Sequence, residues 1–505
     1  MRPAAYTLAV LVAVLVAPPA PAQRAHPADS VRADLALLRG ALAAYHPALD
    51  KYGQRAEVEA HVDSIDAALA VRAAPVASRE AAALVAGVLA EVRDGHTRIN
   101  PLNQTPATRD ALWGGRAALP FTFRIVGPAG DERLAVGHDL SPDGALPRGT
   151  QVVTVGGLTV ARWLDRLAAL SPGDGRGARA LRRARLETAG PDLAEDGWPL
   201  ADVLAPLAFP ALSDTVALTV RRPGAHADQP VRVARLTRAG RADRLREAGA
   251  LTFTDERSWE TRVLDGETGY LRLGSFLSYQ FSTPADTLLA RSLRDLRARG
   301  ARRLVLDVRG VPGGTLGAET VARFLTSAPV PCRGDAVEVA SDRADPTFFP
   351  YLSSMGQGDG WKQPLPGAAL RPLPGGRSEL LVVPPCEVRP APADAWAGPV
   401  AVLADAHNVS ATFGLLRLVR ENRLAVVVGR PAGGTLRGIS GGVFVLLRLP
   451  RTGLAVDLPL FTYRPAGAPP DGPLVPDVRV EWTASDVERA RDPDLEAALA
   501  ALGDR

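Results

Sequence analysis

The 505-residue chain contains only two cysteines, Cys332 and Cys386. They stand far apart and cannot supply the closely spaced thiolates of a zinc site. No spacing of His, Asp and Glu indicates a metal site either, so we expect no metal and no cofactor. If the protein is exported, the two cysteines could form a disulfide across a loop, and two buried free thiols are the alternative.

Lysine is equally scarce and occurs only at Lys51 and Lys362. Arginine supplies the other positive side chains, but the net charge is only +4 and the arginines are scattered, so no nucleic-acid-binding surface is indicated. The glycine-rich loops lack both the Lys-Ser/Thr of a P-loop and the G-x-G-x-x-G spacing, which argues against a nucleotide site. With 46% hydrophobic and 23% charged residues, the composition is that of a globular protein.

The clearest targeting signal lies at the N-terminus. Arg2 precedes the apolar run AAYTLAVLVAVLVA, and the small residues Ala20 and Ala22 then form an A-x-A pattern. This arrangement predicts a secretory signal peptide over residues 1–22, with Gln23 as the first mature residue. An uncleaved anchor is the alternative, but the run is short for a membrane-spanning helix. We therefore expect a secreted or periplasmic protein with no stable membrane insertion after cleavage.

Residues 23–114 carry a helical pattern. Its best-defined part is SREAAALVAGVLAEVRDGHTRI, where apolar residues recur with helical spacing after Ser78, the expected N-cap. Gly95 stands where a left-handed C-cap is expected, so His96 is predicted to follow directly after the helix.

The pattern changes over residues 115–245 to short strands separated by Gly and Pro, such as LPFTFRIV and GTQVVTVGGLTV. We expect a separate small β-rich domain here. A polar, arginine-rich insertion interrupts it over residues 171–200.

Residues 246–485 alternate between strands and helices. Thr283 and Pro284 open one predicted helix, and RRLVLDVRG, VAVLADA and LAVVVGR are predicted to be buried strands. Such strand-helix-strand units imply an α/β core with parallel pairing. Residues 330–398 are rich in Pro and Gly and are predicted to be a long irregular excursion, and residues 486–505 are predicted to close the chain with a helix.

The segment ADAHNVSATFGLLRLVRENRL, residues 404–424, contains a candidate nucleophile. Ser410 follows a predicted buried strand and precedes a helix, which leaves the backbone N–H of Ala411 available to a developing oxyanion. Helix capping is the commoner reason for a serine at such a position. The preceding strand ends in DVRGVPGGTLG, where Gly313 or Gly314 can bring a bare N–H close to a substrate carbonyl, and a tight turn is the alternative.

A second serine, Ser440, lies in GISGG, which matches the nucleophile elbow G-x-S-x-G of α/β-hydrolases. That elbow requires a helix after the serine, whereas Ser440 precedes the strand-like VFVLLRLP, so an esterase that uses Ser440 is the least favoured hypothesis. The base must be a histidine or a carboxylate, because arginine stays protonated. The candidates are His46, His96 and His407, each with a structural role as the alternative.

Together these stretches resemble the tail-specific, or C-terminal processing, serine peptidase family, and more closely its tricorn-core-like bacterial branch. The resemblance is carried, in the family's order, by DGHTRI, by GTQVVTVGGLTV, which is similar to a turn and strand of a PDZ domain, by YLRLGSF with LVLDVRGVPGG, and by GPVAVLADAHNVSATFG with AVVVGRPAGG. It implies a ClpP/crotonase-like α/β core over residues 246–485, with an N-terminal helical domain and an inserted PDZ-like domain.

The resemblance to the tricorn-like branch also implies roles for individual residues. Ser410 would be the nucleophile and His96 the general base and acid. The oxyanion donors would be Gly313 or Gly314 together with Ala411.

The chain departs from the family at three positions. Thr435 stands where the lysine-dependent branch has its lysine, so a Ser-Lys dyad is absent. Gly95 replaces the serine that precedes the histidine in the tricorn core, and Phe413 replaces a frequent glutamate. Asp471 is an approximate counterpart of the glutamate that pairs with the histidine, and Asp94 is the other candidate for orienting it.

We therefore predict a secreted serine-type endopeptidase that cleaves polypeptides through an acyl-enzyme intermediate. The alternative from another functional class is a non-catalytic protein that binds peptides or apolar ligands on the same fold.

Overall fold

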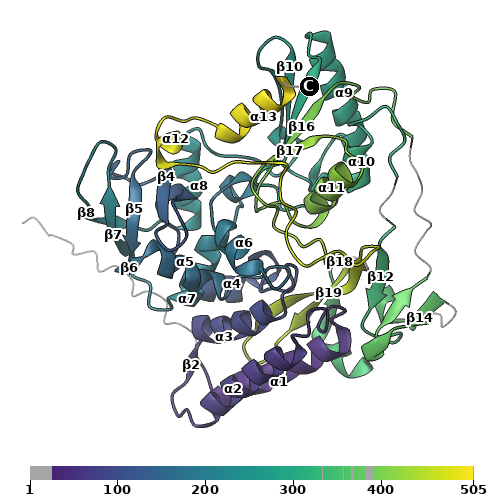
Figure 1. The fold of residues 1–505 in the computed structure, drawn as a ribbon. Coiled ribbons are helices and arrows are strands. Elements are labelled where there is room, and N and C mark those ends of the chain that lie inside the picture. The colour runs from purple at the N-terminus through teal and green to yellow at the C-terminus, as the bar shows by residue number, and fades with distance from the viewer. Residues whose placement is uncertain (1–24, 332–333, 357, 366–368, 382–389, 504–505) are drawn as a thin grey trace, which may run out of the picture.

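The computed structural model describes residues 25–331, 334–356, 358–365, 369–381 and 390–503 (Figure 1). The predicted signal peptide and both cysteines, Cys332 and Cys386, lie outside these residues. Within the described ranges, no helix is both long enough and apolar enough to span a bilayer.

Helices form most of the N-terminal part of the chain, as its pattern predicts. They are α1 (Ala28–Tyr45), α2 (Arg55–Ala70), α3 (Ser78–Glu91) and α4 (Pro106–Trp113), with the short strands β1 (Ala25–His26) and β2 (Val76–Ala77). The apolar faces of α1, α2 and α3 share one core with strands β18 (Ser440–Arg448) and β19 (Ala455–Arg464), beside which they lie in Figure 1. The N-terminal helices are therefore attached to the strand pair that begins at Ser440.

The predicted ends of α3 differ from the observed ones. Ser78 is the first helical residue rather than the cap, and its hydroxyl lies 3.0 Å from Nε2 of His26. The left-handed residue after the helix is Arg93, with φ 57°, and not Gly95. Gly95 is needed for another reason, because a β-carbon there would lie 2.8 Å from Oδ2 of Asp174. The side chain of Asp174, far away in the sequence, therefore leaves no room for a side chain at position 95.

The β-rich part forms an antiparallel sheet with strand order β3-β4-β5-β7-β8, and β6 pairs with β5. Its strands are β3 (Phe121–Val126), β4 (Arg133–Asp139), β5 (Gln151–Val155), β6 (Leu158–Thr159), β7 (Thr215–Arg221) and β8 (Gln229–Ala234). Four helices accompany it: α5 (Val160–Ala168), α6 (Ala178–Ala184), α7 (Leu200–Ala208) and α8 (Arg238–Glu247). Helices α5 and α7 share the apolar core of the sheet.

The α/β core is a six-stranded sheet with the order β20-β17-β16-β11-β10-β9, in which every neighbouring pair is parallel except β9 with β10. Its strands are β9 (Trp259–Val263), β10 (Thr268–Leu273), β11 (Arg303–Asp307), β16 (Val400–Ala404), β17 (Val426–Gly429) and β20 (Val478–Arg479). The helices of this part are α9 (Ala285–Ala298), α10 (Ala318–Ala322), α11 (Ser410–Glu421), α12 (Ala484–Glu488) and α13 (Pro493–Gly503). Helices α9, α10 and α11 pack in one apolar cluster with the sheet, and α13 packs in another, so the predicted parallel α/β core is confirmed.

A second six-stranded sheet has the order β13-β18-β19-β12-β15-β14. Four short strands from residues 330–398 join the β18-β19 hairpin there: β12 (Ala336–Val339), β13 (Leu352–Ser354), β14 (Leu370–Pro372) and β15 (Ser378–Leu380). The prediction of an irregular excursion was wrong in this respect. Strands of three or four residues are too short to show a period-two pattern, and the hairpin that orders them comes later in the chain.

The outer edge of β3 is covered by the arginine-rich insertion. The backbone N–H of Phe123 donates to Oγ1 of Thr188 (2.8 Å), and that of Ile125 donates to Oε1 of Glu187 (2.8 Å). The backbone N–H of Thr188 returns a bond to the carbonyl of Phe123 (3.3 Å). The hydrogen-bonding groups of this sheet edge are therefore used within the chain.

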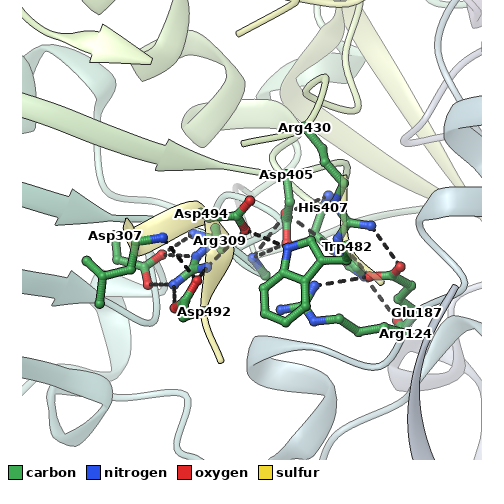
Figure 2. Close-up of polar contacts among 12 residues, drawn as sticks. Arg124, Glu187, Asp307, Arg309, Asp405, His407, Arg430, Trp482, Asp492 and Asp494 are labelled. Atoms are coloured by element: carbon green, nitrogen blue, oxygen red, sulfur yellow. Dashed lines mark hydrogen bonds and ion pairs between the residues drawn. The ribbon is translucent and has the colours of Figure 1, made fainter. Parts of the chain in front are cut away.

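A buried ion cluster connects the same edge to the α/β core (Figure 2). Glu187 is 1% exposed at its side chain and accepts two hydrogen bonds of 2.7 Å from Arg430, which follows β17. Arg124 of β3 lies 3.4 Å from the same carboxylate. Burial acts to raise the pKa of Glu187, but the two arginines outweigh it and hold the pKa below its ordinary value. The carboxylate therefore stays ionised and ties β3 to the core.

Replacing Glu187 by Gln removes this charge while keeping the side-chain shape. We expect the free energy of unfolding to fall by about 3 kcal/mol, because Arg430 is left in the interior without its counter-charge. Urea denaturation measures the change. The control is Asp286→Asn, which breaks the exposed Arg323–Asp286 pair and should cost less than about 1 kcal/mol. Equal, small losses for both variants would contradict the assignment.

Candidate active site

Ser410 lies at the sharp turn between β16 and α11. It is the first residue of the helix, and its φ of 54° falls in the left-handed region that residues other than glycine rarely adopt. The N-cap position is Val409, and no side-chain capping bond is made there. Helix capping therefore does not explain this serine. A strained serine between a strand and a helix is typical of a nucleophile held out toward its substrate.

Buried polar groups hold the turn that precedes this serine. Asp405, 2% exposed, accepts hydrogen bonds from the backbone N–H groups of Gly310 (3.1 Å) and His407 (3.0 Å). Asn408, fully buried, donates to the carbonyl oxygen of Val308 (2.6 Å). These bonds fix the turn to the glycine-rich loop after β11.

Two glycines of that loop are fixed by close neighbours. Gly313 has φ 93°, and a β-carbon there would lie 2.8 Å from Cβ of Ser410 and 2.9 Å from the backbone N of Ala411. Gly314 has φ 154°, and its β-carbon would lie 2.3 Å from the carbonyl oxygen of Phe276. The structure thus brings Gly313 and Ala411 together beside Ser410, whereas Gly314 is packed against Phe276.

A cavity of about 200 Å³ opens at Ser410. Its walls are the glycine-rich loop, the first turns of α10 and α11, and the start of β18. Its lining residues are Gly314, Thr315, Leu316, Gly317, Ala318, Glu319, Asp335, Ser410, Ala411, Phe413, Arg417, Gly438, Ile439, Ser440, Gly441, Gly442 and Tyr463. Ser440 is the first residue of a nine-residue strand, so the helix that an elbow requires does not follow it.

His96 lies on the turn after α3 and packs against Phe444 of β18, with 5.5 Å between the ring centroids. Burial lowers the pKa of its imidazole to about 4. Asp94 opposes this shift, and Arg98 and Arg185 add to it. The ring is therefore neutral near pH 7, and its Nδ1 makes no hydrogen bond within the described chain.

The start of β18 contacts both halves of the predicted catalytic pair. No hydrogen bond or ion pair joins Ser410 to His96 among the described residues. Ser440 lines the cavity at Ser410 and also lies beside the carboxylate of Asp94. Phe444, further along the same strand, contacts the His96 ring. The start of β18 thus adjoins both the cavity at Ser410 and the surroundings of His96.

Within the described chain, neither carboxylate predicted to orient His96 hydrogen-bonds its ring. Asp94 accepts the backbone N–H of His96 (2.9 Å). Asp471 accepts the hydroxyl of Thr435 (2.8 Å) and the backbone N–H of Arg176 (2.7 Å). Both carboxylates therefore hold turns of the backbone.

Asp174 is a candidate site residue that the sequence did not reveal. Its side chain is buried, Oδ1 accepts the backbone N–H of Gly95 (3.0 Å), and Oδ2 has no hydrogen-bond partner in the described residues. Burial raises the pKa of Asp174 to about 7, and repulsion from Asp94 adds to the shift. The only sequence signal is its position in the Gly-rich turn SPGDGRG, which resembles many surface turns.

Lys51 is the second such residue. Its amine donates to the carbonyl oxygen of Gly438 and lies 3.5 Å from Oγ1 of Thr462. Burial lowers the pKa of this amine, although Asp174 acts to raise it. Gly438 follows Thr435 by three residues, so a lysine from the turn between α1 and α2 lies at the turn whose own sequence lacks one. The one signal in the sequence that could have pointed to Lys51 is the rarity of lysine in this chain.

The arrangement supplies most parts of an acyl-transfer site. It has a hydroxyl on a strained turn, the backbone of Gly313 and Ala411 beside that serine, and a neutral imidazole that packs against strand β18. Within the described ranges, no group of three His, Cys, Asp or Glu side chains is placed to hold a metal ion.

Residues 267–480 match the sequence profile of Peptidase family S41. Strands β10 to β20 all lie in this segment. It also contains the loop of Gly313 and the turn of Ser410. No curated protein matches the chain in sequence.

Among solved structures, mature CPAF complexed with lactacystin is 14% identical to the chain, with a TM-score of 0.63 over 94% of this chain and 97% of that one. A CPAF mutant gives 14% identity and a TM-score of 0.61 over 92% and 94%. The photosystem II D1 C-terminal processing protease gives 16% identity and a TM-score of 0.41 over 94% and 97%. The mixed α/β fold is thus shared with CPAF. Residues 267–480 are thus a Peptidase family S41 segment, and this match indicates a serine-type peptidase.

Proposed function

We propose that the protein is an exported endopeptidase that cleaves polypeptides through an acyl-enzyme intermediate on Ser410. The observation that carries the proposal is the contact of the strained Ser410 turn with Gly313. It supports a hydroxyl presented to the substrate with backbone N–H groups of Gly313 and Ala411 beside it. Such donors stabilise the negative charge that develops on a carbonyl oxygen under attack.

In the proposed reaction the Ser410 hydroxyl attacks the scissile carbonyl carbon, and its proton passes to the neutral imidazole of His96. The tetrahedral oxyanion accepts hydrogen bonds from the N–H groups of Gly313 and Ala411. The imidazolium then protonates the leaving amine, and the peptide bond breaks to give an ester on Ser410. A water molecule, deprotonated by His96, hydrolyses this ester and restores the serine.

This reaction requires His96 to approach Ser410, and we assign the necessary movement to the start of β18. Gly438 and Gly442 have φ of 98° and 81°, and the register of the β18-β19 pair is irregular between Gly441 and Phe444. Such a segment can shift at lower cost than a regular strand.

Asp471 remains our candidate for the carboxylate that stabilises the protonated histidine. It binds the backbone of Arg176, and Asp174 in the same turn binds Gly95, next to His96. One turn of the insertion therefore links Asp471 to the segment of the histidine.

We further propose that the β3–β8 sheet is PDZ-like and recruits polypeptides by strand addition. The edge of β3 is occupied by Glu187 and Thr188. The other edge strand, β8, pairs only with β7 among the described strands, which makes it the available edge.

Replacing Ser410 by Ala should abolish both peptide hydrolysis and labelling by a fluorophosphonate, with a loss in kcat of at least about a thousandfold. The matched control is Ser440→Ala, which lies in the same cavity but precedes a strand. Labelling that survives in the Ser410 variant would refute the nucleophile. A wild-type protein that neither labels nor hydrolyses unfolded proteins would instead favour the non-catalytic binding protein.

His96→Gln should lower kcat/KM by about a hundredfold or more, because it removes the proposed base. Since the pKa of His96 is lowered to about 4, the imidazole is neutral above that value, and kcat/KM of the wild type should fall only as the pH drops through about 4. His226→Gln, in an exposed turn, is the control. Circular dichroism at each pH separates titration from unfolding. If the residual kcat/KM of His96→Gln still falls as the pH drops through about 4, His96 is not the proposed base.

Export rests on the sequence of residues 1–22. Expression of the full chain in a bacterium with an active secretion pathway should yield a protein outside the cytoplasm whose first residue is Gln23. N-terminal sequencing and intact mass measure this. An intact N-terminus in a membrane fraction would identify the segment as an anchor.

A further inference from the structure

One turn of the chain, residues 46–54 between α1 and α2, contacts several segments that surround the proposed catalytic pair. We call it the 46–54 turn. Gln54, which is fully buried, fixes it to the end of α3, because its side-chain amide donates to the carbonyl oxygen of Val92 (2.9 Å). Arg176 of the arginine-rich insertion donates to the carbonyl oxygen of Tyr52. The turn is therefore held on two sides by hydrogen bonds to other parts of the chain.

From this turn, His46 reaches the segment of the proposed base. Burial lowers the pKa of its imidazole, so the ring is neutral at pH 7. Its Nδ1 accepts the backbone N–H of Ala48 (3.2 Å), so the proton lies on Nε2, which donates to Oγ1 of Thr97 (2.8 Å). The Thr97 hydroxyl donates to Oδ1 of Asp94 (3.1 Å), which also accepts the backbone N–H of His96 (2.9 Å). A chain of hydrogen bonds thus joins this turn to the turn of His96.

Lys51 of the same turn reaches the start of β18. Its amine donates to the carbonyl oxygen of Gly438 and lies 3.5 Å from Oγ1 of Thr462 on β19. Gly438 lines the cavity at Ser410, whereas Lys51 is not among the described residues that line it. Lys51 therefore acts on this cavity through the backbone of Gly438.

The segment that Lys51 holds has few constraints within its own strand pair. Gly438 has φ 98°, and a β-carbon there would lie 1.9 Å from the carbonyl oxygen of Tyr463, so the position requires glycine. The register of the β18-β19 pair is irregular between Gly441 and Phe444. Because the strand ladder is interrupted there, a contact from outside the pair contributes to fixing the segment.

The charge of Lys51 complements the carboxylates that hold the His96 turn. Burial lowers the pKa of Lys51, but Asp174 and Asp94 oppose this shift. Asp94 accepts the backbone N–H of His96, and Asp174 accepts that of Gly95 (3.0 Å). The amine at the Gly438 turn is thus attracted by the same carboxylates that hold the base.

We propose that Lys51 and His46 are positioning residues, which hold the Gly438 turn and the His96 turn to one loop and so set the base against the Ser410 cavity. The inference rests on the proposed reaction of Ser410 and His96. It makes the turn between the first two helices part of the catalytic assembly. Neither positioning residue lines the Ser410 cavity among the described residues, so their loss should affect kcat and leave KM nearly unchanged.

Lys51→Met tests this role, because it removes the donor and the charge but keeps an unbranched side chain. We expect kcat for fluorescein-labelled casein to fall about tenfold with KM changed by less than about twofold, and labelling by a fluorophosphonate to slow in parallel. Lys51→Arg keeps a charged donor and should recover most of the loss. The control is Lys362→Met, at the only other lysine, which pairs with the exposed Asp359 (2.8 Å) and should match the wild type. Full activity of Lys51→Met would overturn the proposal.

A double-variant cycle tests whether the two links act through one loop. Thr97→Val removes the hydroxyl that connects His46 to Asp94 with little change of shape. If both links hold the same two turns, Lys51→Met with Thr97→Val should lose about as much kcat as the slower single variant. Losses that multiply would show independent effects and would overturn the proposal. All rates are measured well below the melting temperature of each variant, determined by circular dichroism.

Hydrogen–deuterium exchange separates this role from the peptidase function. In Lys51→Met, the amides of residues 436–444 should exchange at least about threefold faster than in the wild type, while those of α9 should not change. If exchange depends on Lys51 but the wild type neither hydrolyses casein nor reacts with the fluorophosphonate, the peptidase function is refuted and the contact stands. If the wild type is active while neither exchange nor kcat depends on Lys51, the positioning role alone is refuted.

Discussion

The structure depends on one buried carboxylate, that of Glu187. It belongs to the β-rich part by sequence and accepts the N–H of Ile125, yet its principal partner, Arg430, follows a strand of the core. Its backbone oxygen lies 3.1 Å from Nε2 of His407, three residues before Ser410. Burial acts to lower the pKa of His407, but Asp405 outweighs it and raises the pKa. A single residue of the insertion thus supports both a sheet edge and the Ser410 turn.

That bracing explains how the turn tolerates its strain. A non-glycine residue at φ 54° costs free energy that the surrounding bonds must offset. Asp405 and Asn408 supply these bonds from buried positions, and Gly313 leaves room for Ser410 on the other side. Buried bonds therefore hold the Ser410 turn, whereas the glycine-containing start of β18 has an irregular register.

The features that could be predicted from the sequence are those that short local patterns determine. The Ser410 turn, the glycine loop, the parallel strands and the strand after Ser440 follow from apolar runs and turn residues within short windows. The β12–β15 strands, Asp174 and Lys51 could not be predicted, because each is placed by partners from another part of the chain. Gly95 was assigned to a helix end for the same reason, since the carboxylate that excludes a side chain there comes from the insertion.

The same long-range assembly determines the chemistry of His96. Its turn is packed between α3 and β18, so burial and two nearby arginines hold the pKa of the imidazole at about 4. A base this weak is always neutral at pH 7 but accepts a proton poorly. Of the charged groups near the ring, Asp94 opposes this shift, so the proposed base depends on a carboxylate two residues away that also holds the backbone of its own turn.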